Sequence, residues 1–193
     1  MRQERIRVGL AAAARLVVLG IALAVSTALR WARLFPNNDP IMAVLLPCAK
    51  RGRVAAFAFP VIAMVLFDVL SRRLGVWTVA TAATYGCLGL GFSSLYAALG
   101  RRGRSVGPAT FLVSGIAGVL VFDFVTGPIL SSILFRMSFA QAFVGQIPFT
   151  VKHLASVAAY TLVVGPLLDR VLDQVGRIEG VIERRLAGAS RTA

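Results

Sequence analysis

The sequence contains few acidic residues. Only 8 of its 193 residues are aspartate or glutamate, against 21 lysines and arginines, and charged residues make up 15% of the chain. Soluble globular domains carry about 25% charged residues, whereas 58% of this chain is apolar. This shortage of charge excludes an ordinary soluble domain and predicts an all-α integral membrane protein.

Metal-binding and redox-active residues are equally scarce. The chain has 1 histidine and 2 cysteines, and Cys48 and Cys87 lie in apolar surroundings without C-x-x-C spacing. Neither a disulfide framework nor a zinc site is indicated, because one histidine alone does not make a metal site. P-loop, H-E-x-x-H and G-x-S-x-G motifs are also missing. We therefore expect no metal, no cofactor and no catalytic activity, so any transport energy must come from another chain.

The positive charge follows the boundaries of the apolar blocks. A net charge of +13 would suggest a nucleic-acid partner for a soluble protein. Here the basic residues cluster at residues 2–7, 50–53, 101–104 and 184–185. Membrane proteins fix their orientation with lysine and arginine in cytoplasmic loops. The pattern therefore indicates a lipid bilayer rather than nucleic acid.

Apolar blocks predict about six membrane spans, because a helix needs about 20 apolar residues to cross the bilayer. The spans are expected at residues 8–29, 39–49, 54–71, 76–99, 106–127 and 148–168. Arg15 interrupts the first block and no clear cleavage site follows, so we expect a retained span rather than a signal peptide. Residues 128–146 are expected to form a short helix or a lid lying on the bundle.

The second block is the weak point, since eleven residues reach only about 16 Å, roughly half the hydrocarbon thickness. We expect a short tilted helix there. The preceding residues 36–40 would then dip below the outer surface, where irregular backbone is tolerated only if it lines a protein cavity.

Basic residues favour six spans with both termini in the cytoplasm of a multi-pass protein of the cell membrane. Fourteen lysines and arginines then fall in cytoplasmic segments and five in outer segments. The chain divides into a transmembrane domain, residues 1–170, and a cytoplasmic tail, residues 171–193. Apolar residues recur in the tail at three- and four-residue spacing, which predicts an amphipathic helix.

Asp68 and Asp123 are the main functional candidates, because an ionisable residue inside a bilayer costs at least about 2.5 kcal/mol. Both are expected in the outer third of their spans. Polar residues from the first outer loop, the lid and the last span are expected at the same level: Asn37, Asn38, Asp39, Gln146, Lys152 and His153. Trp77 could stack on a flat ligand, and so could Tyr85, Tyr96 and Phe149. This convergence predicts a substrate-binding pocket open to the outside. The alternative is that the aspartates only pair with basic residues to lock helices together.

The first span carries small residues four positions apart, Gly20, Ala24 and Ala28. Such a stripe allows helices to approach closely, either inside the bundle or against another membrane subunit. The spacing alone favours packing inside the bundle.

Several short motifs resemble the substrate-binding (S) components of energy-coupling factor (ECF) transporters. They are Asn37-Asn38-Asp39-Pro40, Phe67-Asp68, Gly75-Val76-Trp77-Thr78, Phe122-Asp123-Phe124-Val125-Thr126-Gly127-Pro128 and Gln146-Ile147-Pro148-Phe149-Thr150. The resemblance covers most of residues 10–170. The short second span and the lack of a substrate-specific signature depart from the family pattern.

This resemblance implies a six-helix protein that captures a vitamin or similar micronutrient on the outer side. Its partners would be a transmembrane coupling subunit and two cytoplasmic ATPases, and it would topple in the membrane to release substrate. Small residues on the first helix contact the coupling subunit in that family, which would make Gly20, Ala24 and Ala28 a partner interface. Two rivals stay open: a self-sufficient transporter in which Asp68 and Asp123 carry protons, and a membrane scaffold without transport activity.

Overall fold

The computed structural model of this chain describes residues 2–34 and 37–189, and within these ranges it contains helices and no strands. The elements are α1 (Arg2–Ala32), α2 (Ile41–Arg51), α3 (Arg53–Leu70), α4 (Val76–Arg101), α5 (Pro108–Phe124), the π-helical turn η1 (Val125–Ile129), α6 (Leu130–Phe135) and α7 (Phe139–Ala189). The predicted all-α fold is confirmed.

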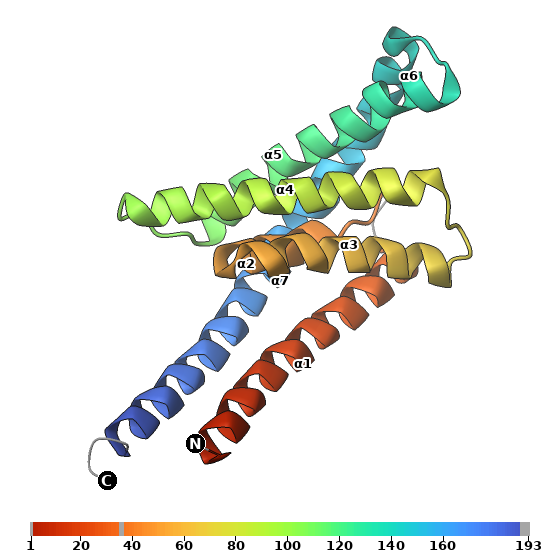
Figure 1. Cartoon of the computed structure of the whole chain (residues 1–193). Coiled ribbons are helices and arrows are strands. Elements are labelled where there is room, and N and C mark those ends of the chain that lie inside the picture. Colours follow the sequence, from red (N-terminus) through yellow and green to blue (C-terminus); the bar gives the residue numbers. More distant parts are fainter. Residues whose placement is uncertain (1, 35–36, 190–193) are drawn as a thin grey trace.

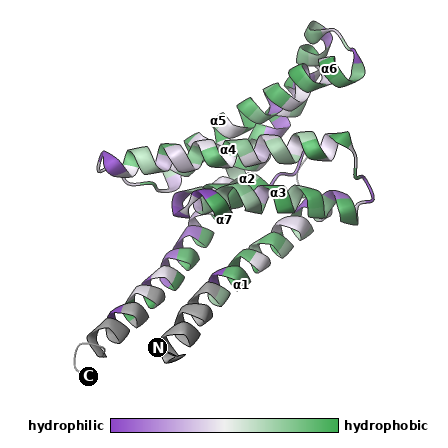
Figure 2. Cartoon of the chain, viewed as in Figure 1, coloured by the Kyte–Doolittle hydropathy of each residue, from purple (hydrophilic) through white to green (hydrophobic). Residues whose placement is uncertain are grey.

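Five helical segments in the described ranges are long and apolar enough to cross a membrane. They are Ala13–Ala32, Arg53–Leu70, Val76–Arg101, Pro108–Phe135 and Phe139–Ile178. Their outward faces carry large apolar side chains, such as Val54, which is 83% exposed, and Val79, which is 70% exposed. Figure 2 shows hydrophobic residues along α3, α4 and α5, with hydrophilic residues at the connecting loops. A surface of this kind is suited to lipid, and the chain is a multi-pass membrane protein.

The short helix α2 lies at the centre of the bundle. Every residue from Ile41 to Ala49 is buried, and α2 contacts α3, α4, α5 and α7. A helix that is apolar on all sides is expected to be enclosed by other elements. A short helix at this position is thus confirmed, whereas its role as a tilted sixth span stays a prediction. It is covered by protein rather than by lipid, so its 11 residues need not match the thickness of the bilayer.

The helices α3 and α4 approach each other closely at Gly89. A Cβ atom added to Gly89 would lie 1.9 Å from the backbone oxygen of Ala56. No side chain fits at that distance, so glycine is required for this contact. The sequence of α4 thereby fixes how tightly the α3–α4 pair packs.

The segment predicted as a lid belongs to two longer helices. The helix α5 continues through η1 into α6, and α7 already begins at Phe139. A short helix, α6, is present as predicted, but it lies at the tip of the α5–α7 hairpin and does not cover the bundle (Figure 1). The prediction of a lid is therefore wrong. Pro128 does not end the helix, because the π-helical turn accommodates its missing N–H group.

The loops divide between the two ends of the bundle. Figure 1 shows the α1–α2 connection, the α3–α4 loop and α6 toward one end, which we call the loop end. Both termini and the α4–α5 loop lie toward the other end, which we call the terminal end. The helix α7 passes through residue 170 without a break, so residues 171–189 of the tail are helical as predicted, and residues 190–193 lie outside the described ranges.

Ion pairs fasten α2 to α7 toward the terminal end. Lys50 Nζ lies 2.8 Å from Asp169 Oδ2, Arg51 Nη1 lies 2.6 Å from Asp169 Oδ1, and Arg51 Nη2 lies 2.8 Å from Asp173 Oδ1. These basic residues entered the sequence analysis only as topology markers. They also have a structural role, because they fix the position of the central helix against α7.

Candidate functional site

The α1–α2 connection is held in place by one face of α7. Ser156 Oγ donates a hydrogen bond to the backbone oxygen of Asn37 (2.9 Å), and Tyr160 OH donates to Asn38 Oδ1 (2.6 Å). Residues 153, 156 and 160 follow helical spacing and therefore lie on the same side of α7. This side places Asn37, Asn38 and Asp39 next to His153.

His153 joins two aspartates from different elements. Its Nε2 lies 3.0 Å from Asp39 Oδ2, and its Nδ1 lies 2.8 Å from Asp123 Oδ1 on α5. The hydroxyl of Tyr85, on α4, donates a hydrogen bond to the same oxygen of Asp39. We call Asp39, Tyr85, Asp123 and His153 the Asp–His–Asp network. Its members are between 1% and 6% exposed, so the network connects four segments in the interior of the protein.

The network carries a net negative charge. Both contacts of the imidazole with carboxylates need a proton, so two protons are shared among Asp39, His153 and Asp123. The trio then has a charge of about −1 wherever each proton lies. In the part of the chain that the structure describes, Asp123 Oδ2 has no hydrogen-bond partner.

Asp39 lies just before α2 and outside the five candidate spans. This position stabilises its ionised carboxylate. Its Oδ1 accepts a hydrogen bond from the N–H group of Ile41 (3.0 Å), at the helix end that favours negative charge. Burial alone would raise the pKa of Asp39, but the hydrogen bond and charge of His153, together with the charge of Arg30 and the hydrogen bond from Tyr85, lower the pKa by more than burial raises it. The pKa of Asp39 therefore lies below its ordinary value, and the carboxylate is ionised at neutral pH.

A polar cavity of about 580 Å³ lies beside the network. We call it the loop-end cavity. Its lining comes from α1, the α1–α2 connection, α3, the α3–α4 loop, α4, α5 and α7: Arg30, Arg33, Asn37, Asn38, Asp39, Phe67, Arg73, Tyr85, Phe122, Phe149 and His153. Small-molecule sites usually have volumes of roughly 300–1,000 Å³ and combine apolar walls with a few polar groups. The loop-end cavity has both properties.

Aromatic rings form a continuous wall of this cavity. The ring centroids of Tyr85 and Phe122 are 4.3 Å apart. His153 meets Phe122 edge to face at 6.0 Å and Phe149 edge to face at 5.9 Å. Such ring pairs pack rigidly and present flat apolar surface. The wall is suited to a flat or unsaturated part of a ligand.

The structure brings together five of the residues that the sequence predicts for the site. Asn37, Asn38, Asp39 and His153 line the loop-end cavity, and Asp123 binds His153. They come from three separate segments of the chain. The predicted convergence of polar groups near one end of the bundle is found for these five.

Four other predicted residues lie elsewhere. Asp68 is half-buried and accepts a hydrogen bond from Thr78 Oγ1 (2.6 Å), which links α3 to the start of α4. Trp77 is 39% exposed and packs near Phe135, with 6.0 Å between ring centroids. Lys152 is exposed, because neighbouring side chains on a helix point about 100° apart and its side chain therefore points away from that of His153.

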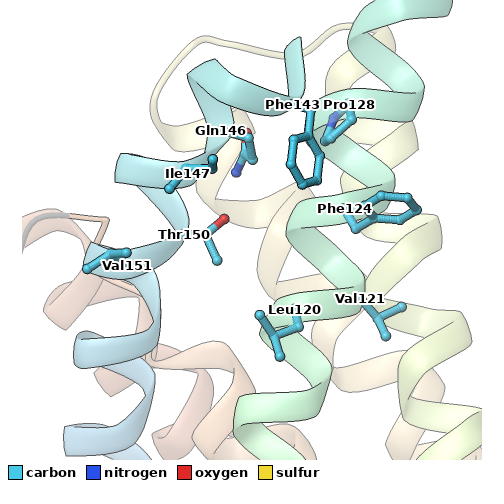
Figure 3. A pocket seen from close by; sticks show the side chains of 9 residues that line it. All are labelled: Leu120, Val121, Phe124, Pro128, Phe143, Gln146, Ile147, Thr150 and Val151. Carbon is cyan, nitrogen blue, oxygen red and sulfur yellow. The ribbon is translucent and has the colours of Figure 1, made fainter. Parts of the chain in front are cut away.

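Gln146, the last of the four, lines a second cavity of about 490 Å³ between α5, η1 and α7 (Figure 3). This cavity is bounded by Leu120, Val121, Phe124, Pro128, Phe143, Gln146, Ile147, Thr150 and Val151. Gln146 and Thr150 are its only polar residues, and most of its apolar residues are also exposed on the outer surface. It is a hydrophobic groove on the face that meets lipid, not a site for a polar ligand.

The stripe of small residues on α1 faces outward. Gly20, Ala24 and Ala28 are exposed, and a Cβ atom added to Gly20 would meet nothing within 4 Å. The opposite face, which includes Ser26 and Leu23, packs toward the bundle. The packing inside the bundle that the spacing favours is therefore not found.

Sequence reasoning missed the arginines of the cavity. Arg30, Arg33 and Arg73 counted only as topology markers, and Tyr85 only as an aromatic residue that could stack on a ligand. Tyr85 does carry a signal of its own, because a buried phenol in an apolar span needs a hydrogen-bond partner. No comparable signal distinguishes an arginine that lines a cavity from one that faces water.

No protein-family model matches the chain, and no curated protein or solved structure was found to be similar to it.

Proposed function

We propose that this chain is the substrate-capture subunit of an ECF-type importer in the cell membrane, and that its loop-end cavity binds a vitamin or similar small micronutrient. The observation that supports this proposal most is a polar, aromatic-walled cavity of about 580 Å³ beside the buried Asp–His–Asp network. Buried ionisable groups are costly in a membrane protein and usually mark a functional site. The excess of basic residues at the terminal end supports an orientation in which the loop end faces outward from the cell.

The geometry of the network favours binding over catalysis. Both ring nitrogens of His153 contact carboxylates. The neighbouring hydroxyl of Ser156 donates to the backbone oxygens of Asn37 and His153 at 2.9 Å and 3.2 Å. The imidazole therefore does not activate this hydroxyl as a nucleophile. The network instead holds the α1–α2 connection against α4, α5 and α7, which gives the cavity a fixed shape before a ligand arrives.

The resemblance to S components supplies the partners in this proposal: a transmembrane coupling subunit and two cytoplasmic ATPases. The outward stripe of Gly20, Ala24 and Ala28 is consistent with a partner helix, because small residues let two backbones approach closely within a membrane. Energy from a separate ATPase also agrees with the absence of a P-loop motif from the sequence.

Native mass spectrometry of gently purified protein tests substrate capture. Wild-type protein is expected to carry one co-purifying small molecule per chain. Phe149→Ala should weaken binding about fivefold and so lower the occupancy, because an aromatic contact contributes about 1 kcal/mol beyond area burial. Phe143→Ala is the matched control: both phenylalanines lie on α7 and are 44% and 43% exposed, but only Phe149 lines the loop-end cavity. A wild-type protein without any bound molecule, or equal occupancy in the two variants, would contradict the proposal.

A self-sufficient proton-coupled transporter is the second candidate. The chain of carboxylate, imidazole and carboxylate from Asp39 to Asp123 favours it, because proton relays in membranes are built from such groups. The relay would run through His153 and would not include Asp68. Uptake of the co-purified compound into vesicles that contain this chain alone, driven by a pH gradient, would establish this second function. No uptake without an ATPase partner would favour substrate capture.

A further inference from the structure

Three guanidinium groups border the loop-end cavity, and none of them forms an ion pair with a carboxylate of the described residues. Arg30 and Arg33 lie at the end of α1, and Arg73 lies in the α3–α4 loop. Among the described side chains, no carboxylate lies within ion-pair distance of any of the three. Arg51, toward the terminal end, differs because it pairs with Asp169 and Asp173 of α7.

Arg30 is held in position but most of its donors are unused. Its Cζ atom lies 4.3 Å from the ring centroid of Phe67, and its Nη1 donates a hydrogen bond to Met64 Sδ (2.8 Å). A guanidinium group has five N–H donors, and thioether sulfur is a weak acceptor. The aromatic ring orients the guanidinium group without satisfying it.

The nearby acidic residues are already engaged. Asp39 accepts hydrogen bonds on both of its oxygens, from Ile41, Tyr85 and His153. The trio of Asp39, His153 and Asp123 has a charge of about −1, because two protons are shared between two carboxylates and one imidazole. Three arginines therefore leave the cavity with a net charge of about +2.

We infer that the molecule bound in the loop-end cavity is an organic anion, whose carboxylate or phosphate group binds Arg30, Arg33 and Arg73. Guanidinium groups pair with both kinds of anion through two parallel hydrogen bonds. This inference rests on the proposed capture function and specifies its substrate class.

The rest of the ligand packs against the aromatic wall. Tyr85, Phe122 and Phe149 belong to α4, α5 and α7, whereas the arginines belong to the last turn of α1, the residue directly after it and the α3–α4 loop. A ligand that touches both sets of residues has a charged group at one side and a flat or unsaturated body at the other. A cationic ligand would instead meet a cavity whose net charge is already about +2.

The probe for the test is the small-molecule extract of the expression host, separated by anion exchange into a retained fraction of anions and an unretained fraction of neutral and cationic compounds. Purified protein is incubated with each fraction, and thermal stabilisation and the mass of the bound molecule are measured. Stabilisation by the anionic fraction alone is expected. Stabilisation by the unretained fraction alone would overturn the inference while leaving substrate capture intact, and no binding from either fraction would contradict both.

Arg73→Gln and Arg72→Gln form a matched pair of variants. The two residues are exposed neighbours in the same loop, but only Arg73 lines the cavity. Without extract, both variants should unfold at the same temperature, because neither side chain has a hydrogen-bond or ion-pair partner among the described residues. We expect Arg73→Gln to need at least tenfold more of the anionic fraction for half-saturation, and Arg72→Gln to behave as wild type. Equal effects of the two substitutions would overturn the assignment of the anion to these arginines.

An anionic lipid headgroup could offer the same phosphate. The measurement is therefore repeated in nanodiscs of phosphatidylcholine alone and of phosphatidylcholine with phosphatidylglycerol. Binding of the anionic fraction in both nanodiscs supports a soluble anion. Arg73-dependent retention of phosphatidylglycerol, with no binding of the anionic fraction, would support the anion site but contradict the capture of a soluble substrate.

Discussion

Asp39, His153 and Asp123 are expected to contribute to stability as one coupled unit. His153→Gln removes two charge-assisted hydrogen bonds of 3.0 Å and 2.8 Å. It also leaves two buried carboxylates within about 8 Å of each other, where their repulsion at an effective dielectric constant of about 20 is about 2 kcal/mol. Together with the lost hydrogen bonds, we expect the free energy of unfolding to fall by about 4 kcal/mol.

Asp123→Asn should cost less, because asparagine has the same shape and leaves the contact between Asp39 and His153 in place. A loss of about 2 kcal/mol is expected from the weaker hydrogen bond to His153. In the His153→Gln background, the same change removes one of two uncompensated carboxylates and should cost almost nothing. The double variant is therefore expected near 4 kcal/mol rather than 6 kcal/mol, a coupling energy of about 2 kcal/mol.

Unfolding in mixed detergent, followed by tryptophan fluorescence, measures these free energies. The control combines Asp123→Asn with Asp68→Asn, because Asp68 binds Thr78 and shares no partner with the network. The control pair should be additive within about 0.5 kcal/mol. Additive effects of His153→Gln and Asp123→Asn would refute the reasoning, because the two side chains would then not share a buried charge.

Three further predictions concern the bundle and its charges. Gly89→Ala should lower the free energy of unfolding by roughly 2 kcal/mol or more, because its Cβ atom would meet the backbone of α3. Gly91→Ala should be neutral or stabilising, since open space surrounds Gly91. Asp169→Asn should cost roughly 1–3 kcal/mol in the same unfolding assay, and the more exposed Asp173→Asn less than about 1 kcal/mol. The difference in free energy of unfolding between wild type and Asp39→Asn should be constant near neutral pH and shrink only in acid, below the ordinary titration range of aspartate. The reason is that the lowered pKa of Asp39 contributes stability above that range, and this stability is lost as the pH falls through the pKa of Asp39 in the folded protein. A difference that already shrinks between pH 7 and pH 5 would contradict this.

The apolar pattern predicts most of the fold, because lipid imposes a simple rule on composition. Blocks of about 20 apolar residues correspond to the long helices, and the weak block at residues 39–49 corresponds to α2. The pattern fails at residues 128–146, where Pro128 and Pro148 suggest helix ends. Proline tolerates a helix interior when a π-helical turn or neighbouring helices compensate for its missing donor, and such compensation is a tertiary effect.

The site is only partly predictable for a related reason. Asp123 and His153 can be predicted as site residues because ionisable residues are rare in apolar spans. Asp39 can be predicted because residues 36–40 are expected to dip below the outer membrane surface. Which face of a helix turns inward depends on packing, so Lys152 was grouped with His153 although it points elsewhere. The arginines could not be identified from the sequence, because basic residues at the ends of spans are also expected from membrane topology alone. Only the folded chain shows that Arg30 and Arg73 border the same cavity.

Accessibility of the loop end from outside the cell tests the central claim most directly. Single cysteines are introduced as Arg33→Cys at the loop end and Arg102→Cys in the α4–α5 loop, with Cys48 and Cys87 replaced by alanine, and intact cells are treated with a membrane-impermeant maleimide. Labelling of the cysteine at position 33 in intact cells, and of the one at position 102 only after permeabilisation, is the expected result. The reverse pattern would place the loop-end cavity in the cytoplasm and contradict the capture of an external substrate.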